Sequence, residues 1–466
     1  MEARGDLRSI LPYLPVVLRG GALFWPPPAQ EAIKALALGP DVSRVSSGDV
    51  LADAITDLRL ALNLDPLPRR AAEGLAIFFD DLLSRAQARD WFDHILPSLA
   101  RLLLRLPTLL EDHYRSGGYQ EESRGLRILG SQDGGIVLVS QELAAALLAC
   151  ALFCLFPTAD RAQARLPPIN FDSLFAALCN NSRQSQEQKV RCLVHYFDRV
   201  TASTPTGSVS FERKVLHRCP VSDSITYPDM DAWMKSGVPL CTFRKMRNKK
   251  PLKLTLQIDI WEEEHFPEAV CRYGSSFRFT GDYLDSKPFD AMGRRKTRIV
   301  AIDALDCPTR LQFESSGLIR EVNKAFCGFL DQSNHQLYVK LVQDLNTKDS
   351  CASIIPDECI GVSTGNWGCG AFGGNPEIKS MIQWIAASQA LRSYINYYTF
   401  ESGSLKRLEE VTQWILLHRW TVGELWHMLV EYSSQKLGRE TNEGFFTWLL
   451  PKDIPNDICL LSHIHG

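Results

Sequence analysis

A glycine-rich stretch between Ser363 and Gly374 is the segment with the clearest capacity for chemistry. It reads Ser-Thr-Gly-Asn-Trp-Gly-Cys-Gly-Ala-Phe-Gly-Gly, and five glycines fall between Gly365 and Gly374. Glycine permits close backbone approach, so several N–H groups can converge on one phosphate. The stretch has no lysine of the Walker type, which favours a diphosphate held by backbone alone. A tight structural turn that packs a helix on a sheet is the alternative, and both interpretations stay open at this point.

The flanking sequence predicts the elements that would position this loop. The apolar run Cys359–Val362 can end a strand, and Pro376 suits the first turn of a helix because its missing N–H is not needed there. Apolar residues then recur at helical spacing at Ile378, Met381, Ile382 and Ile385. An aromatic, β-rich segment, Tyr394–Phe400, follows. The unit therefore reads strand, glycine loop, helix, strand, and the helix start would add partial positive charge at the loop.

Composition places the chain among ordinary globular proteins. Its 466 residues are enough for two or three domains, 45% are hydrophobic, and the net charge of -3 gives no reason to expect direct nucleic-acid binding. The thirteen cysteines include no Cys-x-x-Cys pair, which favours free thiols in a reducing compartment. The first residues lack the plan of a secretory signal, and the longest apolar run, Leu143 to Phe156, is too short for a membrane span. We therefore expect a soluble intracellular protein without a membrane partner.

The pattern along the chain changes near residue 200. Helical periodicity dominates from about 29 to 115, a buried helix is predicted over 143–156 with Ser140 as its N-cap, and an amphipathic helix over 188–200. Downstream, predicted strands at 254–260 and 298–305 alternate with predicted helices at 319–330, 405–417 and 422–432. This alternation predicts an α/β layered domain over 201–466, preceded by a helical domain over 1–200.

Several segments together resemble one known family, the poly(ADP-ribose) glycohydrolases, and are closest to its plant-type members. Thr364–Gly374 is similar to the family's diphosphate loop almost residue for residue. Further resembling segments occur in the family's order over nearly the whole chain: Asn170–Leu174, His195–Phe197, Ser210–Lys214, Thr297–Leu305, Asn323–Phe329, Tyr398–Phe400 and Trp420–Trp426.

The resemblance implies a fold, a ligand and a reaction. The fold would be α/β, a macrodomain-like mixed sheet with helices on both faces behind an α-helical accessory domain. The ligand would be the terminal ADP-ribose of poly(ADP-ribose), carried by poly(ADP-ribosyl)ated proteins, and the reaction hydrolysis of the ribose–ribose glycosidic bond. The resemblance implies no cofactor and no metal ion, a role in the DNA damage response, and a location in nucleus and cytoplasm.

The resemblance also implies roles for individual residues. Asn366, Gly368, Gly370, Gly373 and Gly374 would cradle the diphosphate and the nearby ribose, and Asp259 would contact the ligand. Phe400 would pack against the ligand, and Tyr273 would stack on the adenine. Each role has a structural alternative: Asn366 as a turn residue, Phe400 as core, and Tyr273 as an exposed loop aromatic.

The chain departs from the family pattern where the catalytic acid should be. The family's triple glycine followed by Gln-Glu-Glu does not occur after the strand that ends near Asp259, and the family's Asn position holds Glu262. Glycosidic cleavage needs an acid that protonates the leaving oxygen. Glu262, Glu263 and Glu264 are weak candidates for that acid, because a solvated charge run explains them as well. Gln120-Glu121-Glu122 spells the triplet, but it lies out of order in the helical region.

Three hypotheses follow, with one runner-up fold. The chain is a member of the glycohydrolase family with weakened or absent activity, an ADP-ribose-binding module without catalysis, or a non-functional truncated isoform. Gly368–Gly373 also spells Gly-x-Gly-x-x-Gly, the fingerprint of a Rossmann-type dinucleotide domain. No acidic residue closes a second strand about twenty residues on, as that fold requires, so we rank it second.

Overall fold

The computed structural model describes residues 5–116, 125–130, 133–181, 183–203, 206–217, 226–246, 265–270, 278–284, 287–290, 294, 296–330, 361–370, 372–400 and 402–451. The chain divides into two compact units. Unit 1 comprises residues 1–213 and 253–299, and unit 2 comprises residues 214–252 and 300–466. The predicted division into 1–200 and 201–466 stays a prediction.

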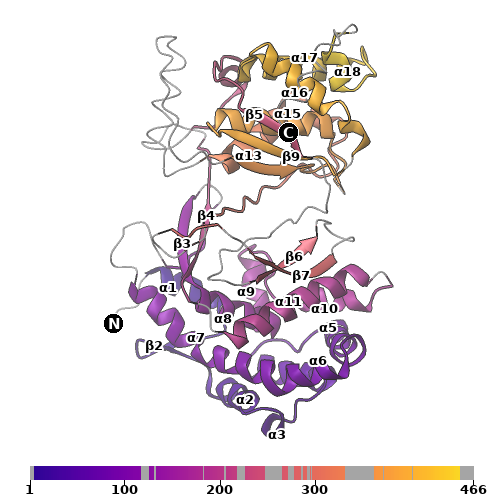
Figure 1. The fold of residues 1–466 in the computed structure, drawn as a ribbon. Coiled ribbons are helices and arrows are strands. Elements are labelled where there is room, and N and C mark those ends of the chain that lie inside the picture. Colours follow the sequence, from indigo (N-terminus) through magenta and orange to yellow (C-terminus); the bar gives the residue numbers. More distant parts are fainter. Residues whose placement is uncertain are drawn as a thin grey trace. The chain divides into compact units, whose positions relative to one another are not determined.

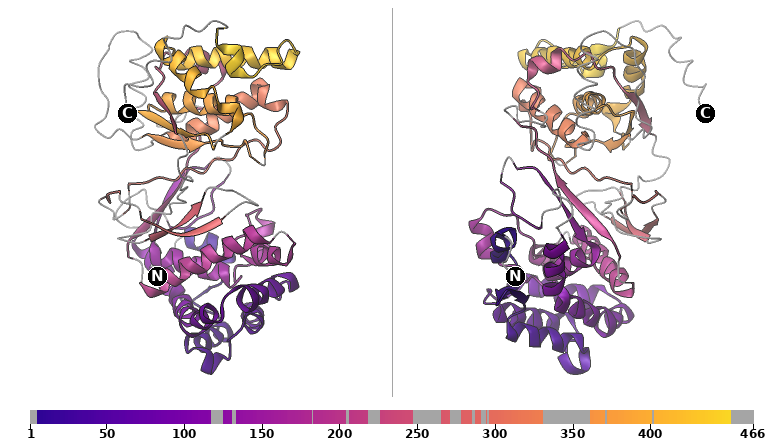
Figure 2. Two further views of the ribbon diagram at one scale, coloured as in Figure 1. Left: turned by 45° about the vertical axis from the view of Figure 1, so that its right-hand side comes forward. Right: turned by 90° about the vertical axis from the view of Figure 1, so that its left-hand side faces the viewer.

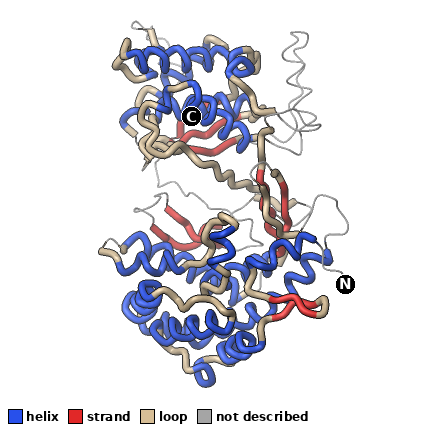
Figure 3. Tube along the Cα trace, turned by 180° about the vertical axis from the view of Figure 1, so that it is seen from behind, coloured by secondary structure: helices blue, strands red, loops and turns tan. Residues whose placement is uncertain are grey.

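In the residues that the structure describes, unit 1 is mainly helical (Figures 1 and 3) and contains three antiparallel strand pairs. Its α-helices are α1 Gly5–Ile10, α2 Pro27–Ala37, α3 Pro40–Ser43, α4 Gly48–Ala61, α5 Arg69–Ala76, α6 Arg85–Asp90, α7 Leu96–Ser116, α8 Gln141–Leu152, α9 Thr158–Gln163, α10 Asp172–Ala176 and α11 Gln184–Ala202. Its strands pair as β1 Val17–Arg19 with β2 Ala22–Phe24, β3 Gly135–Ser140 with β4 Ser208–Arg213, and β6 His265–Val270 with β7 Arg278–Leu284.

The longest helix of unit 1 contains a proline, and a side chain from another segment replaces the hydrogen bond that the proline removes. Pro107 lies inside α7 and has no N–H, so the Leu103 carbonyl loses its helical donor. The indole Nε1 of Trp25 donates to that carbonyl oxygen over 2.7 Å, and Trp25 is only 1% exposed. The α7 interior is therefore satisfied by a tryptophan from the Pro-rich N-terminal region.

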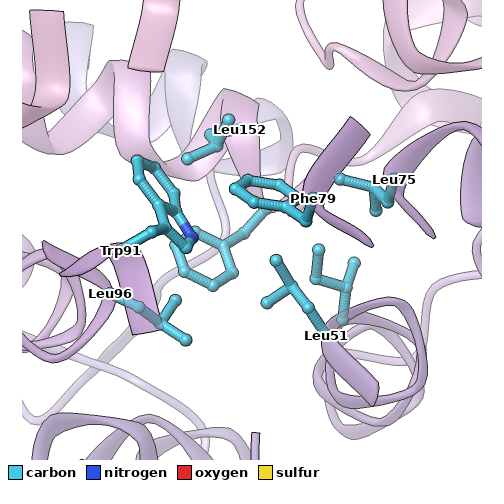
Figure 4. A pocket seen from close by; sticks show the side chains of 8 residues that line it. Leu51, Leu75, Phe79, Trp91, Leu96 and Leu152 are labelled. Atoms are coloured by element: carbon cyan, nitrogen blue, oxygen red, sulfur yellow. The ribbon is translucent and has the colours of Figure 1, made fainter. Parts of the chain in front are cut away.

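A small apolar cavity lies in the core of unit 1. It is lined by Leu51, Ile55, Leu75, Phe79, Trp91, Leu96, Leu152 and Phe153. Figure 4 shows the rings of Phe79 and Trp91 side by side in it, and their centroids lie 5.1 Å apart. The Trp91 Nε1 atom is buried without a hydrogen-bond partner in the described part of the chain. With no charged side chain in its wall, the cavity is a packing feature of the core rather than a site for chemistry.

The helix predicted over 143–156 ends earlier than expected. Ser140 is its N-cap, as predicted, and its Oγ accepts from Leu143 N over 3.2 Å. The helix ends at Leu152, because Cys154 has a left-handed φ of 55° and the Leu155 N–H turns back to the Cys150 carbonyl.

In its described residues, unit 2 is an α/β layer built on three parallel strands in the order β5-β9-β8. Figures 1 and 2 show its helices packed around this small sheet. The strands are β5 Thr242–Met246, β8 Val362–Gly365 and β9 Tyr394–Tyr398. The helices are α12 Met230–Met234, α13 Ser315–Phe329, α15 Pro376–Gln389, α16 Leu408–Leu417, α17 Val422–Gly438 and α18 Phe445–Leu449. The predicted strand, loop, helix, strand unit is confirmed, and every residue from Ile378 to Ser388 is buried.

One predicted strand of this domain is absent from the structure. Residues 298–305 are described, but they form no strand. Ile299 and Val300 are 40% and 44% exposed, and the Ile302 carbonyl accepts from Trp367 Nε1 instead of from a neighbouring strand. The apolar run is therefore only partly buried and pairs with no strand among the described residues. Side-chain hydrophobicity does not specify which backbone partner a segment finds. The predicted strand at 254–260 lies outside the described residues.

We predict that Asn170→Ala destabilises unit 1. The Asn170 amide accepts from Phe156 N over 3.1 Å and donates to Phe156 O over 2.9 Å, and Asn170 is 9% exposed. The truncation leaves both backbone groups buried without partners, which should lower the free energy of unfolding by about 2–3 kcal/mol. Chemical denaturation followed by circular dichroism measures it. Asn181→Ala, at an exposed position, is the matched control and should change stability by less than about 0.5 kcal/mol; equal effects of the two changes would contradict the prediction.

Candidate functional site

The glycine loop lies at the carboxyl edge of the parallel sheet of unit 2. β8 and β9 are paired in parallel register, Thr364 with Tyr397 and Gly365 with Tyr398, so both strands end at the same edge. The loop leaves β8 after Gly365 and enters α15 at Pro376. Ligands of open α/β sheets bind at this edge, where loops replace the strands.

Asn366 fastens the start of the loop to the end of β9. Its Nδ2 donates to the Thr399 carbonyl over 2.9 Å, and its Oδ1 accepts from the Tyr397 hydroxyl over 3.1 Å. Burial raises the pKa of Tyr397 well above its usual value, so this hydroxyl stays a donor. An asparagine amide has two donor hydrogens and two acceptor lone pairs, so one of each remains for another partner. Asn366 is therefore a turn residue in this structure, with capacity left for a ligand.

The glycines of the loop divide into those that close turns and those that leave N–H groups open. Gly374 N donates to Gly368 O over 2.9 Å and Gly373 N to Gly370 O over 3.1 Å, so these two N–H groups are used inside the loop. Trp367 N and Cys369 N are also used, by Gly365 O and Asn366 O. The N–H groups of Gly368, Gly370 and Phe372 have no partner among the residues the structure describes. Three open N–H groups within five residues are what an anion cradle requires.

Three glycines of the loop resist substitution, Gly368 and Gly374 for lack of space and Gly373 through its left-handed φ of +69°. Gly368 has a φ of +73°, and a Cβ there would lie 2.6 Å from Ala304 Cβ. A Cβ on Gly374 would lie 2.7 Å from the Gly368 carbonyl oxygen. In contrast, a Cβ on Gly370 or Gly373 would meet nothing within 4 Å. The loop is therefore packed tightly on its helix side and open around Gly370 and Gly373.

The start of α15 contributes charge but few free donors. The Asn375 side chain accepts from Glu377 N and Ile378 N, over 2.9 and 3.2 Å, and caps the helix. The helix dipole still places partial positive charge beside the loop. The predicted contribution of the helix end is thus electrostatic, while the open N–H groups come from the loop itself.

Phe400 lies beside the loop with a strained backbone. Its φ is +49°, a left-handed value that is uncommon for an aromatic residue. Its ring lies over Gly365, because a Cβ built on that glycine would be 2.6 Å from Phe400 Cε2. The side chain is 36% exposed, so it is not a core residue. Strain at a sheet edge next to a candidate site is a pattern typical of ligand contacts.

Cys369, inside the loop, is not a reactive thiol. Its Sγ donates to the Trp367 carbonyl over 3.5 Å, and burial raises the pKa of the Cys369 thiol to about 12. A thiol of this kind stays protonated and is a poor nucleophile.

Three polar residues of the site were not predicted from sequence. Gln383 on α15 donates from Nε2 to Gly365 O over 3.0 Å and accepts at Oε1 from Thr364 Oγ1 over 2.6 Å. Lys379, one helical turn earlier, is 1% exposed and forms an ion pair with Glu321 of α13, which is also 1% exposed. Lys379 and Gln383 stand four residues apart among the apolar repeat of the helix directly after the loop, and that spacing is the pattern that could have indicated them.

Other predicted site residues fall outside the described part of the chain. These are Asp259, Glu262, Glu263, Glu264 and Tyr273. Among the described residues, no group of three or more His, Cys, Asp and Glu side chains is arranged to hold a metal ion, and no helix is long and apolar enough to span a membrane.

Comparison with protein families matches both parts of the chain to one family. Residues 83–213 match the family model described as the helical domain of poly(ADP-ribose) glycohydrolase, and residues 250–407 match the model of its macrodomain fold. The macrodomain match contains β8, the glycine loop, α15 and β9. The fold predicted from sequence, a helical domain followed by a macrodomain-like α/β domain, is confirmed.

Comparison with individual proteins agrees with the family match. The chain is 42% identical to poly(ADP-ribose) glycohydrolase 1 of Arabidopsis thaliana, over 97% of this chain and 98% of that protein. It is 41% identical to probable poly(ADP-ribose) glycohydrolase 2 of the same plant, over 97% of this chain and 99% of that protein. A shorter match, 34% identical over 22% of this chain and 11% of the relative, is to poly(ADP-ribose) glycohydrolase 1 of Caenorhabditis elegans. With two domain matches and such identity over nearly its whole length, the chain belongs to the poly(ADP-ribose) glycohydrolase family.

Proposed function

We propose that this protein hydrolyses the ribose–ribose glycosidic bonds of poly(ADP-ribose) and releases ADP-ribose. The observation that carries the proposal is the glycine loop with open N–H groups at the carboxyl edge of a macrodomain sheet, in a member of the glycohydrolase family. The three N–H groups of Gly368, Gly370 and Phe372 would bind the diphosphate of the terminal ADP-ribose. Gly373 and Gly374 would shape the cradle through the turns that they close.

Residues around the loop would hold the rest of the terminal ADP-ribose. Phe400 would pack against the ligand from the exposed edge of the sheet, and Asn366 would use its spare donor or acceptor on the nearby ribose. Asp259 and Tyr273, outside the described residues, would contact the ligand and stack on the adenine. Stacking on an aromatic ring typically contributes about 1–3 kcal/mol per base.

We expect slow hydrolysis because the chain lacks an evident proton donor for the leaving oxygen. Two glutamates near the loop are described, and both are engaged: Glu321 is buried in an ion pair with Lys379, and Glu377 accepts from Phe446 N over 2.8 Å. Burial raises the pKa of Glu377, but its carboxylate is directed at the start of α18. The expected family signature is absent from the sequence. The match to the first Arabidopsis thaliana relative extends over 546 positions against 466 residues here, so at least 80 positions of that match have no residue in this chain. This difference supports the proposal that the acid-bearing segment has been lost.

We further propose where the activity is exerted. The substrates would be poly(ADP-ribose) chains attached to proteins in the nucleus and cytoplasm, as part of the DNA damage response. The chain would not bind nucleic acid directly, because a net charge of -3 offers no general attraction to a polyanion. Microscopy of the tagged protein before and after DNA damage tests this, and exclusion from the nucleus under both conditions would contradict it.

We predict slow but measurable hydrolysis. Purified protein should release ADP-ribose from poly(ADP-ribose) at about 10²–10⁴-fold below the rate of the Arabidopsis thaliana relative, the factor that general acid catalysis supplies. Chromatography of the released nucleotide measures it. The triple variant Glu262→Gln, Glu263→Gln, Glu264→Gln should keep the rate within about twofold. Abolished release in that variant would identify the charge run as the source of the acid, and no release from the unchanged protein would leave an ADP-ribose-binding module.

We predict that Asn366→Ala weakens ADP-ribose binding. The change removes both hydrogen bonds to β9 and any ligand contact of the amide. The Kd for ADP-ribose, measured by calorimetry, should rise about tenfold or more. Asn396→Ala is the control. Asn396 belongs to the same strand pair, but it lies two residues before Tyr398, the last residue of β9, and so not at the edge where the loop begins. Equal affinities of the Asn366→Ala variant and the unchanged protein would contradict a ligand role for this loop.

A further inference from the structure

A buried lysine lies directly against the glycine loop. Lys379 Nζ is 4.0 Å from the centroid of the Trp367 ring. A Cβ on Gly368 would lie 3.4 Å from that nitrogen, and a Cβ on Gly374 would lie 3.4 Å from Lys379 Cε. The end of the Lys379 side chain therefore lies beside the turn that the Gly374 N–H and the Gly368 carbonyl close. A lysine on the helix thus supplies the charge that the loop sequence lacks.

The charge on Lys379 is held by a network of neighbours. Glu321 contacts the ammonium directly, both side chains are 2% exposed, and neither of the two paired atoms has another hydrogen-bond partner in the described residues. Arg320 donates to Glu321 and to Asp303, and Lys324 donates to Asp303. The three cations exceed the two carboxylates by one. The cluster behind the loop is therefore net positive when every member is ionised.

We propose that Lys379 is a positioning residue of the glycine loop, whose ammonium fixes Trp367 and the Gly368–Gly374 turn and adds positive charge behind the open N–H groups. This inference rests on the proposed function, in which those groups bind a diphosphate. Trp367 is fixed at two points, by the cation over its ring and by its Nε1 donation to Ile302 O over 3.1 Å. Because the site around Lys379 excludes water, its charge acts on the loop with little screening.

The pH dependence of binding follows from the surroundings of the amine. Burial, with a smaller contribution from Arg320, lowers the pKa of Lys379 to about 7, while contact with Glu321 acts in the opposite direction. Asp303 is engaged by Arg320 and Lys324, and the Cys369 thiol does not titrate near neutrality. A lysine loses its charge as the pH rises through its pKa. Affinity for a diphosphate should therefore fall between about pH 6 and about pH 9, a range over which the diphosphate keeps its own charge.

The experiment compares three variants with the unchanged full-length chain. Lys379→Met with Glu321→Gln replaces the ion pair by neutral groups of similar size, a change that often leaves folding intact. Lys379→Arg keeps a permanent charge. Lys235→Met is the control, because it removes a cation of the same unit whose side chain, just after α12, is 78% exposed. Calorimetry with ADP-ribose at about pH 6 and about pH 9 measures affinity, and a thermal melt checks folding.

The expected outcome is a separation of folding from affinity. The double variant should melt close to the unchanged chain but bind ADP-ribose about tenfold or more weakly, without pH dependence. Lys379→Arg should retain affinity and also lose the pH dependence, and Lys235→Met should match the unchanged chain. Unaltered affinity in the double variant overturns the inference. If the double variant fails to fold, Lys379→Gln with Glu321→Gln, which replaces the ion pair by two neutral groups that can hydrogen-bond each other, takes its place under the same criterion.

Inorganic pyrophosphate separates this inference from the proposed function. Thermal stabilisation by pyrophosphate needs the loop alone, with no nucleoside contacts. If ADP-ribose does not bind but pyrophosphate stabilises the unchanged chain and not the double variant, the proposed function fails and the role of Lys379 stands. If pyrophosphate stabilises both chains equally, or neither, the role of Lys379 is overturned.

Discussion

The ion pair between Lys379 and Glu321 is the contact on which the candidate site depends. It joins α13 to α15 inside the core of unit 2, and its lysine is packed against the turn between Gly368 and Gly374. Removing one partner of such a pair leaves a buried charge without compensation, typically at a cost of about 3–5 kcal/mol. The helix, the loop and the strand end are therefore mechanically connected, and a disturbance at either charged residue reaches the loop backbone.

The parallel sheet explains why the site lies where it does. β8 and β9 end at the same edge, and Asn366 connects the two ends through Tyr397 and Thr399. Gln383 fixes the last residues of β8 from the helix side. Side-chain contacts thus hold the loop backbone at the ends of β8 and β9 and on the side of α15. Among the residues described, the N–H groups of Gly368, Gly370 and Phe372 remain open donors. A rigid set of donors is what binding of a diphosphate without a lysine contact requires.

Binding and catalysis are separable in this architecture. The cradle is made by residues close together in sequence, within one strand–loop–helix unit. The acid that cleaves a glycosidic bond must come from elsewhere, since the described glutamates beside the loop are committed to Lys379 and to the start of α18. Loss of one segment can therefore remove the proton donor while the cradle keeps its geometry. A family member altered in this way would lose turnover but keep its affinity for ADP-ribose.

The sequence by itself determined the family, the fold class and the position of the loop. Glycine spacing, Pro376 and the apolar repeat after it specify a strand, a loop and a helix, because local backbone preferences and burial periodicity act over a few residues. The N-cap at Ser140 was predicted for the same reason. The early end of the helix at Leu152 was not, since the left-handed Cys154 gives no signature in residue type.

Only the tertiary structure decided which side chains serve the loop. Lys379 and Gln383 could have faced solvent, and Glu321 lies 58 positions before Lys379 in the chain, so nothing local joins them. The segment 298–305 looked like a strand, but the backbone carbonyl of Ile302 is taken by an indole and Asp303 by two cations. Hydrophobic pattern reports that a residue is buried, whereas the partner of a buried charge or of a backbone carbonyl depends on which distant segments fold against it.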